Sequence, residues 1–174
     1  MTSDALRLFF ALHCPPALAA SIATWRDSLQ LSGRPVAQAN LHLTLAFLGQ
    51  QPRARVAELL SLAATLQLPA FDLHLDRLVR RRSGLVYLAP SQAPDGLLEL
   101  AQTLRDALLT AGIPLENRPF LAHLSLLRHC PRLPPAATPS FDWPATHFAL
   151  FASERAPCGS QYQQLQQWPL WRND

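Results

Sequence analysis

Short stretches of alternating hydrophobic and polar residues run through the chain, separated by segments with helical spacing. The apolar run 6–12 ends at two prolines, and the segment 16–29 follows it. Leu18, Ile22 and Trp25 in that segment share one face at the spacing of a helix. This pattern predicts a strand followed by a helix.

The same two patterns recur to the end of the chain. Strands are predicted where polar and apolar residues alternate or where a short apolar run is bounded by turn residues. Helices are predicted where proline precedes a run with helical spacing. The further predicted strands are 41–47, 71–78, 85–88, 121–127, 148–151 and 162–170, and the further predicted helices are 52–66 and 97–109.

The two halves of the chain repeat one scheme, over about residues 6–79 and 84–155. Each half runs through a strand, a proline, a helix, an Arg-Pro pair and a strand carrying His-Leu-Thr/Ser-Leu. Because no linker separates the halves, we expect a single domain, 1–174, of the α+β class with a cleft between two sheets.

Composition narrows the possible classes of protein. Of the 174 residues 49% are hydrophobic, which excludes intrinsic disorder, and no apolar run approaches the roughly 18 residues of a membrane span. The apolar N-terminal run is short and contains Arg7, so we interpret it as a strand and not as a targeting segment.

The net charge and the cysteines constrain the binding partner and the cellular compartment only weakly. The net charge is +3 and every basic residue is arginine, which suits phosphate recognition but does not prove a nucleic-acid partner. Cys14, Cys130 and Cys158 form no CxxC pair. We therefore expect reduced thiols and a cytoplasmic location.

Two tetrapeptides carry the candidate chemistry. In His42-Leu43-Thr44-Leu45 and His123-Leu124-Ser125-Leu126, a histidine stands two residues before a hydroxyl. Residues two apart on a strand share a face, so each motif places an imidazole beside a hydroxyl. If both face one cleft, one histidine can take a proton while the other gives one, as phosphodiester cleavage requires.

A single histidine of this kind is more often structural or solvent-exposed than catalytic. Two copies at equivalent places in a repeat reverse those odds. No HExxH motif, CxxC pair or spaced carboxylate cluster occurs, so we expect no metal site, and no GxSxG nucleophile motif is present. His74 and Asp76 could form an Asp–His couple, which we interpret as a surface feature.

Nearly the whole chain resembles a known family. The resemblance rests on residues 7–12 (RLFFAL), 40–49 (NLHLTLAFLG), 118–120 (RPF), 123–128 (HLSLLR) and 162–170. These segments are similar to the bacterial and archaeal 2′-5′ RNA ligases, also called RNA 2′,3′-cyclic phosphodiesterases, of the two-histidine phosphoesterase superfamily. Ser125 and Ala122 depart from the commoner threonine and proline.

The resemblance implies two pseudo-symmetric lobes, each an antiparallel sheet with packed helices, flanking a central cleft. It implies hydrolysis of an RNA 2′,3′-cyclic phosphate end to a 2′-phosphomonoester, without metal or cofactor and reversible as 2′-5′ ligation. By the resemblance His42 is the proton donor and His123 the proton acceptor, while Thr44, Ser125 and Arg128 bind the phosphate. We expect the partner to be RNA with a cyclic phosphate end. We also expect the protein to be a monomer that does not associate with membranes.

The roles of one arginine and three aromatic residues stay open at the level of sequence. Strict alternation from Ser125 points Arg128 to the opposite strand face, so a phosphate contact and a solvated strand end are both open. Phe47, Tyr87 and Tyr162 could stack on bases, although core packing is favoured for Phe47.

Two other functions remain open at the level of sequence. The enzyme could act on another 2′,3′-cyclic nucleotide, such as ADP-ribose cyclic phosphate, or on 2′-5′ oligonucleotides. Alternatively, the chain could be a binding module that holds an RNA end without converting it.

Overall fold

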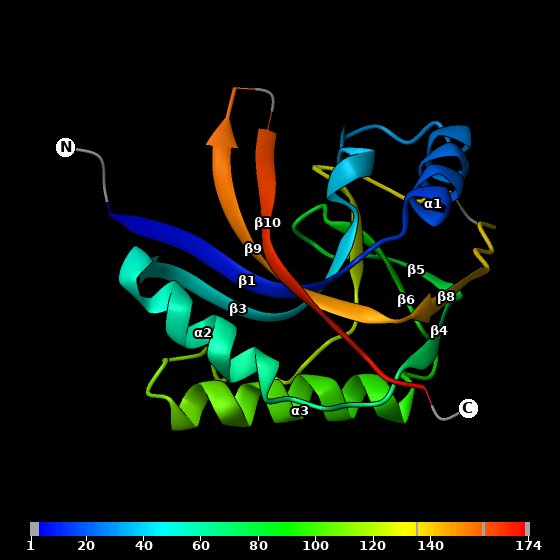
Figure 1. The fold of residues 1–174 in the computed structure, drawn as a ribbon. Helices are drawn as coiled ribbons and strands as arrows, with labels where there is room; N and C mark the ends of the chain where they lie inside the picture. The colour runs from blue at the N-terminus through cyan, green and yellow to red at the C-terminus, as the bar shows by residue number, and fades with distance from the viewer. Residues whose placement is uncertain (1–3, 135, 158, 173–174) are drawn as a thin grey trace.

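The computed structural model describes residues 4–134, 136–157 and 159–172. Figure 1 shows the arrangement of its helices and strands. The elements are β1 (Ala5–His13), α1 (Pro16–Ser28), β2 (Arg34–Pro35), the 3-10 turn η1 (Gln38–Asn40), β3 (His42–Pro52), the 3-10 turn η2 (Arg53–Arg55), α2 (Val56–Ala64), β4 (Phe71–Leu75), β5 (Arg77–Arg80), β6 (Val86–Ala89), α3 (Asp95–Thr110), β7 (Leu124–Arg128), β8 (Phe141–Ala145), β9 (His147–Ala156) and β10 (Gly159–Pro169).

The strands form one long antiparallel sheet and one small one. The long sheet has the order β10-β9-β1-β3-β7-β6-β5, with β2 paired to β7, and β4 pairs with β8 separately. Between β3 and β7 there is a single registered pair, Leu43 with Leu124. Each of these leucines directly follows a motif histidine, so the two halves of the sheet meet at the two motifs.

The helices pack against the strands in two places. Helices α2 and α3 lie below β1 and β3 in Figure 1, and α1 lies at the other end, beside β8. The main core takes residues from both halves of the chain, and Phe10 and Phe148 are among its largest fully buried side chains. A second, small cluster of Phe9, Ala11, Ala149 and Phe151 lies apart from it, and its Phe9 ring contacts the ring of His42 in the first motif.

The two lobes exchange strands along the chain. The lobe that contains the first motif takes β1 and β3 from the N-terminal half and β9 and β10 from the C-terminal half. In the same way, β4 of the first half pairs with β8 of the second. This exchange ties the two repeats into one core.

The prediction of one strand over residues 71–78 is wrong, because the structure divides this segment between two sheets. Residues 71–75 pair with β8, whereas residues 77–80 pair with β6 in the other sheet. The chain changes sheets at Asp76, whose carboxylate accepts hydrogen bonds from the Ser91 backbone N–H (2.7 Å) and hydroxyl (2.6 Å). Alternation stops at the adjacent polar residues Asp76 and Arg77, but this interruption does not show that the two parts pair in different sheets.

Other boundaries also differ from the predictions. Strand β3 continues to Pro52, and η2 precedes α2, so the helix begins at residue 56 and not at 52. Strand β8 was not predicted because Pro144 interrupts its pattern, but proline is tolerated in a two-stranded ribbon, where each strand has a free edge.

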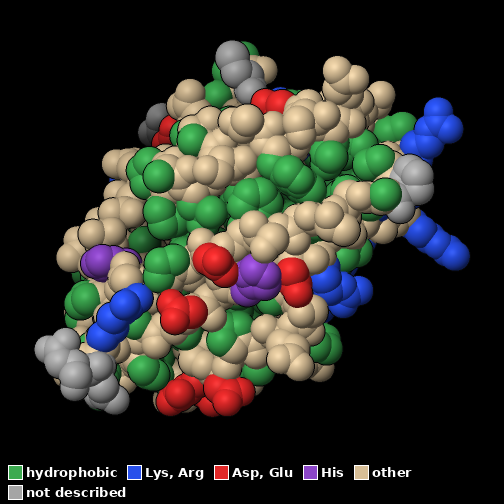
Figure 2. All heavy atoms as spheres, turned by 90° about the vertical axis from the view of Figure 1, so that its right-hand side faces the viewer, with side chains coloured by type: hydrophobic (Ala, Val, Ile, Leu, Met, Phe, Trp, Pro, Cys, Tyr) green, Lys and Arg blue, Asp and Glu red, His purple; other side chains and the backbone are tan. Residues whose placement is uncertain are grey.

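The face in Figure 2 is the right-hand side of Figure 1, where acidic and histidine side chains gather near β4 and β8. His74 of β4 is exposed, but its partner is Asp142, at 2.7 Å from Nδ1, and not Asp76. The couple is therefore a surface feature, as predicted, with a different carboxylate.

Two of the cysteines, Cys14 and Cys130, are buried free thiols, and burial raises the pKa of Cys14 to about 12. Cys158 lies outside the described residues. Among the helices that the structure describes, none has the length and apolar character to cross a membrane.

Candidate active site

All five predicted site residues line one cavity of about 470 Å³. The cavity lies where β3 and β7 meet, and its floor carries His42, Thr44, His123, Ser125 and Arg128. Its walls come from the β2–η1 segment and from the β9–β10 hairpin. The structure thus brings the two motifs together in one hollow.

The two histidines are held in the same way. The Nδ1 atom of His42 lies 2.7 Å from the carbonyl oxygen of Asn40, and Nδ1 of His123 lies 2.9 Å from that of Leu121. A carbonyl only accepts, so each Nδ1 must carry the proton and donate it. Each Nε2 is consequently the nitrogen that can exchange a proton with a ligand.

Aromatic rings fix the position of His42. Its ring centroid lies 5.1 Å from that of Phe9 and 5.2 Å from that of Tyr162, the latter edge-on. Its Nε2 is 3.0 Å from the hydroxyl oxygen of Thr44. The first motif is therefore a packed and hydrogen-bonded couple on one strand face.

Burial lowers the pKa of His42 below its ordinary value, because desolvation disfavours the charged imidazolium. The hydrogen bond to the Asn40 carbonyl opposes this shift, while the positive charges of His13, His123 and Arg128 add to it. His42 is thus mainly neutral at neutral pH when no anion occupies the cavity.

His123 lies just before its strand. The prediction of a strand over 121–127 is wrong at its start, since β7 begins at Leu124. The ring of Tyr87 packs edge-on against His123 at 5.4 Å, and Tyr87 is the register partner of Ser125. These contacts orient the second motif toward the same cavity without ladder pairing of His123 itself.

Arg128 reaches the cavity because β7 contains a bulge. Tyr87 pairs with Ser125 and Val86 with Leu127, which leaves Leu126 as an extra residue. Leu126 and Leu127 are both buried, so the alternation shifts by one. Arg128 therefore returns to the face of Ser125, contrary to strict alternation.

Phe47 is not a core residue, contrary to the interpretation favoured from the sequence. Register shifts between β1 and β3 turn it outward, where it is 42% exposed and lines the cavity. The Arg7 guanidinium lies 4.8 Å above its ring. Tyr87 is buried, whereas Tyr162 is half-buried beside His42.

Sequence reasoning missed several wall residues. Arg34 belongs to the first Arg-Pro pair and lines the cavity, but Arg118 of the second pair lines a different hollow and pairs with Glu116 at 3.0 Å. Arg155 lies on β9, and no local pattern singled it out. Only its place in the hairpin brings it to the site.

Positive charge predominates in the cavity. Four arginines and three histidines line it, and none of the described aspartates and glutamates does. In the part of the chain that the structure describes, no group of three or more His, Cys, Asp or Glu side chains could hold a metal ion. The lining favours an anionic ligand.

An antiparallel sheet that brings two His–hydroxyl couples and a guanidinium into one cavity has the groups needed for acid–base catalysis on a phosphate ester. The model of the 2′-5′ RNA ligase superfamily matches residues 14–155, and the chain belongs to this superfamily.

Individual relatives agree with this assignment. The chain is 39% identical to an RNA 2′,3′-cyclic phosphodiesterase of Escherichia coli K12, over 97% of this chain and 98% of the relative. It is 32% identical to a protein of the same name from Thermus thermophilus, over 95% and 90%. The crystal structure of E. coli LigT with 3′-AMP matches with a TM-score of 0.89 and 37% identity, covering 96% and 99%.

Proposed function

We propose that this protein hydrolyses the 2′,3′-cyclic phosphate at the 3′ end of RNA and leaves a 2′-phosphomonoester, without a metal ion or cofactor. The observation that carries the proposal is the pair of histidines, both oriented by a main-chain carbonyl and both lining one cavity. The printed names of the relatives, RNA 2′,3′-cyclic phosphodiesterase, support this choice of substrate.

In the proposed mechanism each histidine moves one proton. Nε2 of His123 takes a proton from water as the water oxygen attacks phosphorus. The bond between phosphorus and the 3′-oxygen breaks, and Nε2 of His42 protonates the departing oxygen. The phosphate stays on the 2′-oxygen, and the two imidazoles have exchanged protonation states.

The remaining site residues stabilise negative charge. Thr44 and Ser125 donate hydrogen bonds to the non-bridging phosphate oxygens, and Arg128 supplies a guanidinium that can bind two of them. The bound anion also raises the pKa of His42, opposing the effect of burial, so substrate binding itself charges the proton donor.

The same groups suit the reverse type of reaction. If the 5′-hydroxyl of a second RNA replaces water, attack on the cyclic phosphate forms a 2′-5′ linkage with the same two proton transfers. The cyclic phosphate supplies the free energy, so ATP is not required. Membership of the 2′-5′ RNA ligase superfamily supports this second activity.

We also propose that one chain, acting as the single domain 1–174, is the active unit in the cytoplasm. The five site residues of one chain line one cavity, so the proposed chemistry needs no residue from a second copy. The buried free thiols of Cys14 and Cys130 support a reducing compartment. Activity that co-elutes with a dimer in size-exclusion chromatography and is lost on dilution would contradict the monomer.

The direct test is to incubate the protein in EDTA with a short RNA ending in a 2′,3′-cyclic phosphate and to identify the product. We expect a 2′-phosphate, and His42→Ala and His123→Ala should each lower the rate roughly 10²–10⁴-fold. His147→Ala is the matched control, since His147 is exposed and does not line the cavity.

The alternatives give different products. A 3′-phosphate would keep the chemistry but reverse the substrate orientation. RNA recovered unchanged although bound would indicate a binding module. Turnover only of another 2′,3′-cyclic nucleotide or of 2′-5′ oligonucleotides would assign a different substrate.

A further inference from the structure

The cavity holds more positive charge than one cyclic phosphate requires. That group carries a single negative charge, whereas Arg7, Arg34, Arg128 and Arg155 all line the cavity. Within the described residues, none of the four forms an ion pair with a carboxylate. Arg128 lies beside the histidines and Arg7 lies over the ring of Phe47, which leaves the charges of Arg34 and Arg155 unexplained by the reacting group.

Arg34 and Arg128 lie directly opposite each other. They are register partners in the antiparallel pair β2–β7, and both are exposed. Opposite residues of such a pair share a face, and like charges in this position destabilise the pair. An arrangement of this kind suits a surface whose charges are neutralised by a bound anion.

The side chain of Arg34 reaches the β9–β10 hairpin. Gly159, at the start of β10, has a φ of +116°, and a Cβ atom on it would lie only 3.2 Å from Nη2 of Arg34. The guanidinium therefore rests against the main chain of the hairpin. A side chain at position 159 would displace it.

Arg155 lies on β9, next to the position of Gly159 on β10. Its register partner is Ser160, which directly follows Gly159. The side-chain amide of Asn40 donates a 2.7 Å hydrogen bond to the carbonyl of Ser160, so the hairpin is tied to the segment that carries Arg34. In Figure 1 the hairpin rises above the sheet on the same side as η1.

The positive charge is thus divided between two places. One is Arg128 with the two histidines, and the other is Arg34 with Arg155 at the mouth of the cavity. The charge of Arg128 acts on His42, whereas the guanidinium of Arg34 lies against the hairpin at Gly159. In RNA the next phosphate after the cyclic end is the one on the 5′ side of the terminal nucleoside.

We propose that Arg34 and Arg155 form a second anion subsite that binds the internal phosphodiester on the 5′ side of the terminal nucleotide. The preferred substrate is then an RNA of at least two nucleotides and not a cyclic mononucleotide. This inference rests on the proposed function for the orientation of the cyclic end. Arginine suits the subsite because its planar guanidinium can contact two phosphate oxygens at once.

The test compares three substrates with the same terminal base: a nucleoside 2′,3′-cyclic phosphate, its 5′-phosphorylated form, and a dinucleotide ending in the cyclic phosphate. We expect kcat/KM for the dinucleotide to exceed that of the plain nucleoside by about tenfold or more. Arg34→Ala and Arg155→Ala should each reduce this ratio several-fold, and the double variant should abolish it.

The matched control is Arg82→Ala, which removes the same charge from an exposed position outside the cavity and should leave the ratio unchanged. Salt gives a second readout. The dependence of log kcat/KM on log salt should be steeper for the dinucleotide by about 0.7, the value for one more phosphate contact on a single strand. The double variant should lose this extra slope.

Several results would overturn the subsite. Equal kcat/KM for the dinucleotide and the nucleoside would do so, as would a ratio that survives in the double variant. A gain confined to the 5′-phosphorylated nucleoside would assign the two arginines to a free 5′-phosphate instead of an RNA chain.

Failure of the proposed function has a different signature, because then none of the three substrates is hydrolysed by the wild type. In that case equilibrium binding of a dinucleotide 2′-phosphate and of the mononucleotide 2′-phosphate decides the subsite. Tighter binding of the dinucleotide, lost in the double variant, supports it, and equal binding refutes it.

Discussion

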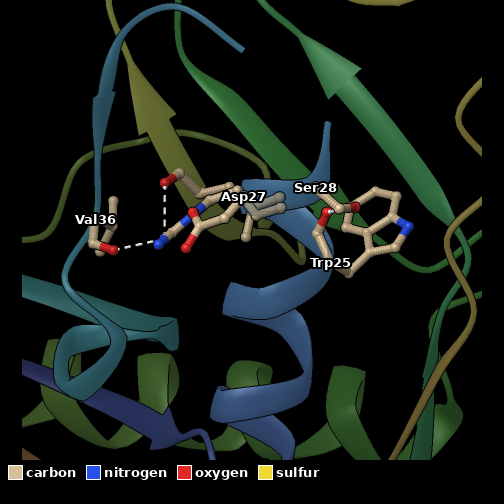
Figure 3. Close-up of polar contacts among 6 residues, drawn as sticks. Trp25, Asp27, Ser28 and Val36 are labelled. Atoms are coloured by element: carbon tan, nitrogen blue, oxygen red, sulfur yellow. Dashed lines mark hydrogen bonds and ion pairs between the residues drawn. The ribbon is translucent and has the colours of Figure 1, made fainter. Parts of the chain in front are cut away.

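Replacing Arg26 by methionine should loosen the wall of the cavity that carries Arg34. Arg26 is only 6% exposed, and its Nη1 donates a 2.6 Å hydrogen bond to the carbonyl of Val36 and a longer one, 3.5 Å, to that of Leu126 (Figure 3). Val36 also donates its N–H to the Leu126 carbonyl at 2.8 Å. One buried guanidinium thus holds the segment after β2 against β7.

The magnitude follows from these contacts. A hydrogen bond from a charged donor contributes about 1.5–3 kcal/mol. The ion pair of Arg26 with Asp27 adds little, because Asp27 is exposed. Methionine keeps most of the apolar stem, so we expect a loss of about 2 kcal/mol in the free energy of unfolding and a fall in Tm of roughly 4–8 °C.

The assay combines thermal unfolding with kinetics on the dinucleotide and nucleoside substrates. Arg105→Met is the matched control, since Arg105 also donates to a main-chain carbonyl, that of Glu116 at 3.0 Å, but at an exposed site outside the cavity. Arg26→Met should lower Tm more than the control does and should raise KM more than it lowers kcat. Equal losses of Tm in both variants, or an unchanged KM for Arg26→Met, would refute the reasoning.

Three further predictions concern the site. Because burial lowers the pKa of His42, the proton donor is charged in the free enzyme only on the acid side, so kcat/KM should peak below pH 7 and fall above it. The kcat profile should lie at higher pH because bound phosphate raises that pKa, and a kcat/KM that still rises above pH 8 would contradict His42 as donor. Thr44→Val removes the hydroxyl 3.0 Å from His42 while keeping its shape, and should lower kcat/KM about 10–100-fold, with activity largely restored in Thr44→Ser. Gly33→Ala should destabilise the fold by about 1–3 kcal/mol and impair phosphate binding, because its Cβ would lie 2.7 Å from the main-chain oxygen of Arg128. The control Gly112→Ala has positive φ but no neighbour within 4 Å, so a loss of stability and activity equal to that of Gly33→Ala would show that the contact with Arg128 is unimportant.

Local sequence was sufficient to predict the chemical pairs. His42 with Thr44 needs only the two-residue period of a strand to share a face, and the structure places both in one cavity. The repeat of this motif at His123 and Ser125 predicted a shared cleft, and the family assignment was also predicted from the linear motifs. These features depend on residues close together in the chain, where periodicity is informative.

Pairing between distant strands determined the positions of the other residues of the cavity. Arg128 and Phe47 reach the cavity through bulges, which change the alternation only in relation to a partner strand. At Asp76 the sequence shows a break in alternation, but only the partner strands show that the chain changes sheets there.

Arg34 and Arg155 are 121 positions apart, and the β2–β7 pair and the β9–β10 hairpin bring them to one wall. The lowered pKa of His42 has the same origin, since it arises from burial against rings of other strands and not from its neighbours in sequence. The groups that do the chemistry could be identified from the linear chain, because the residues of each motif are local. The charges that surround them could not, because register and burial are set by contacts across the fold.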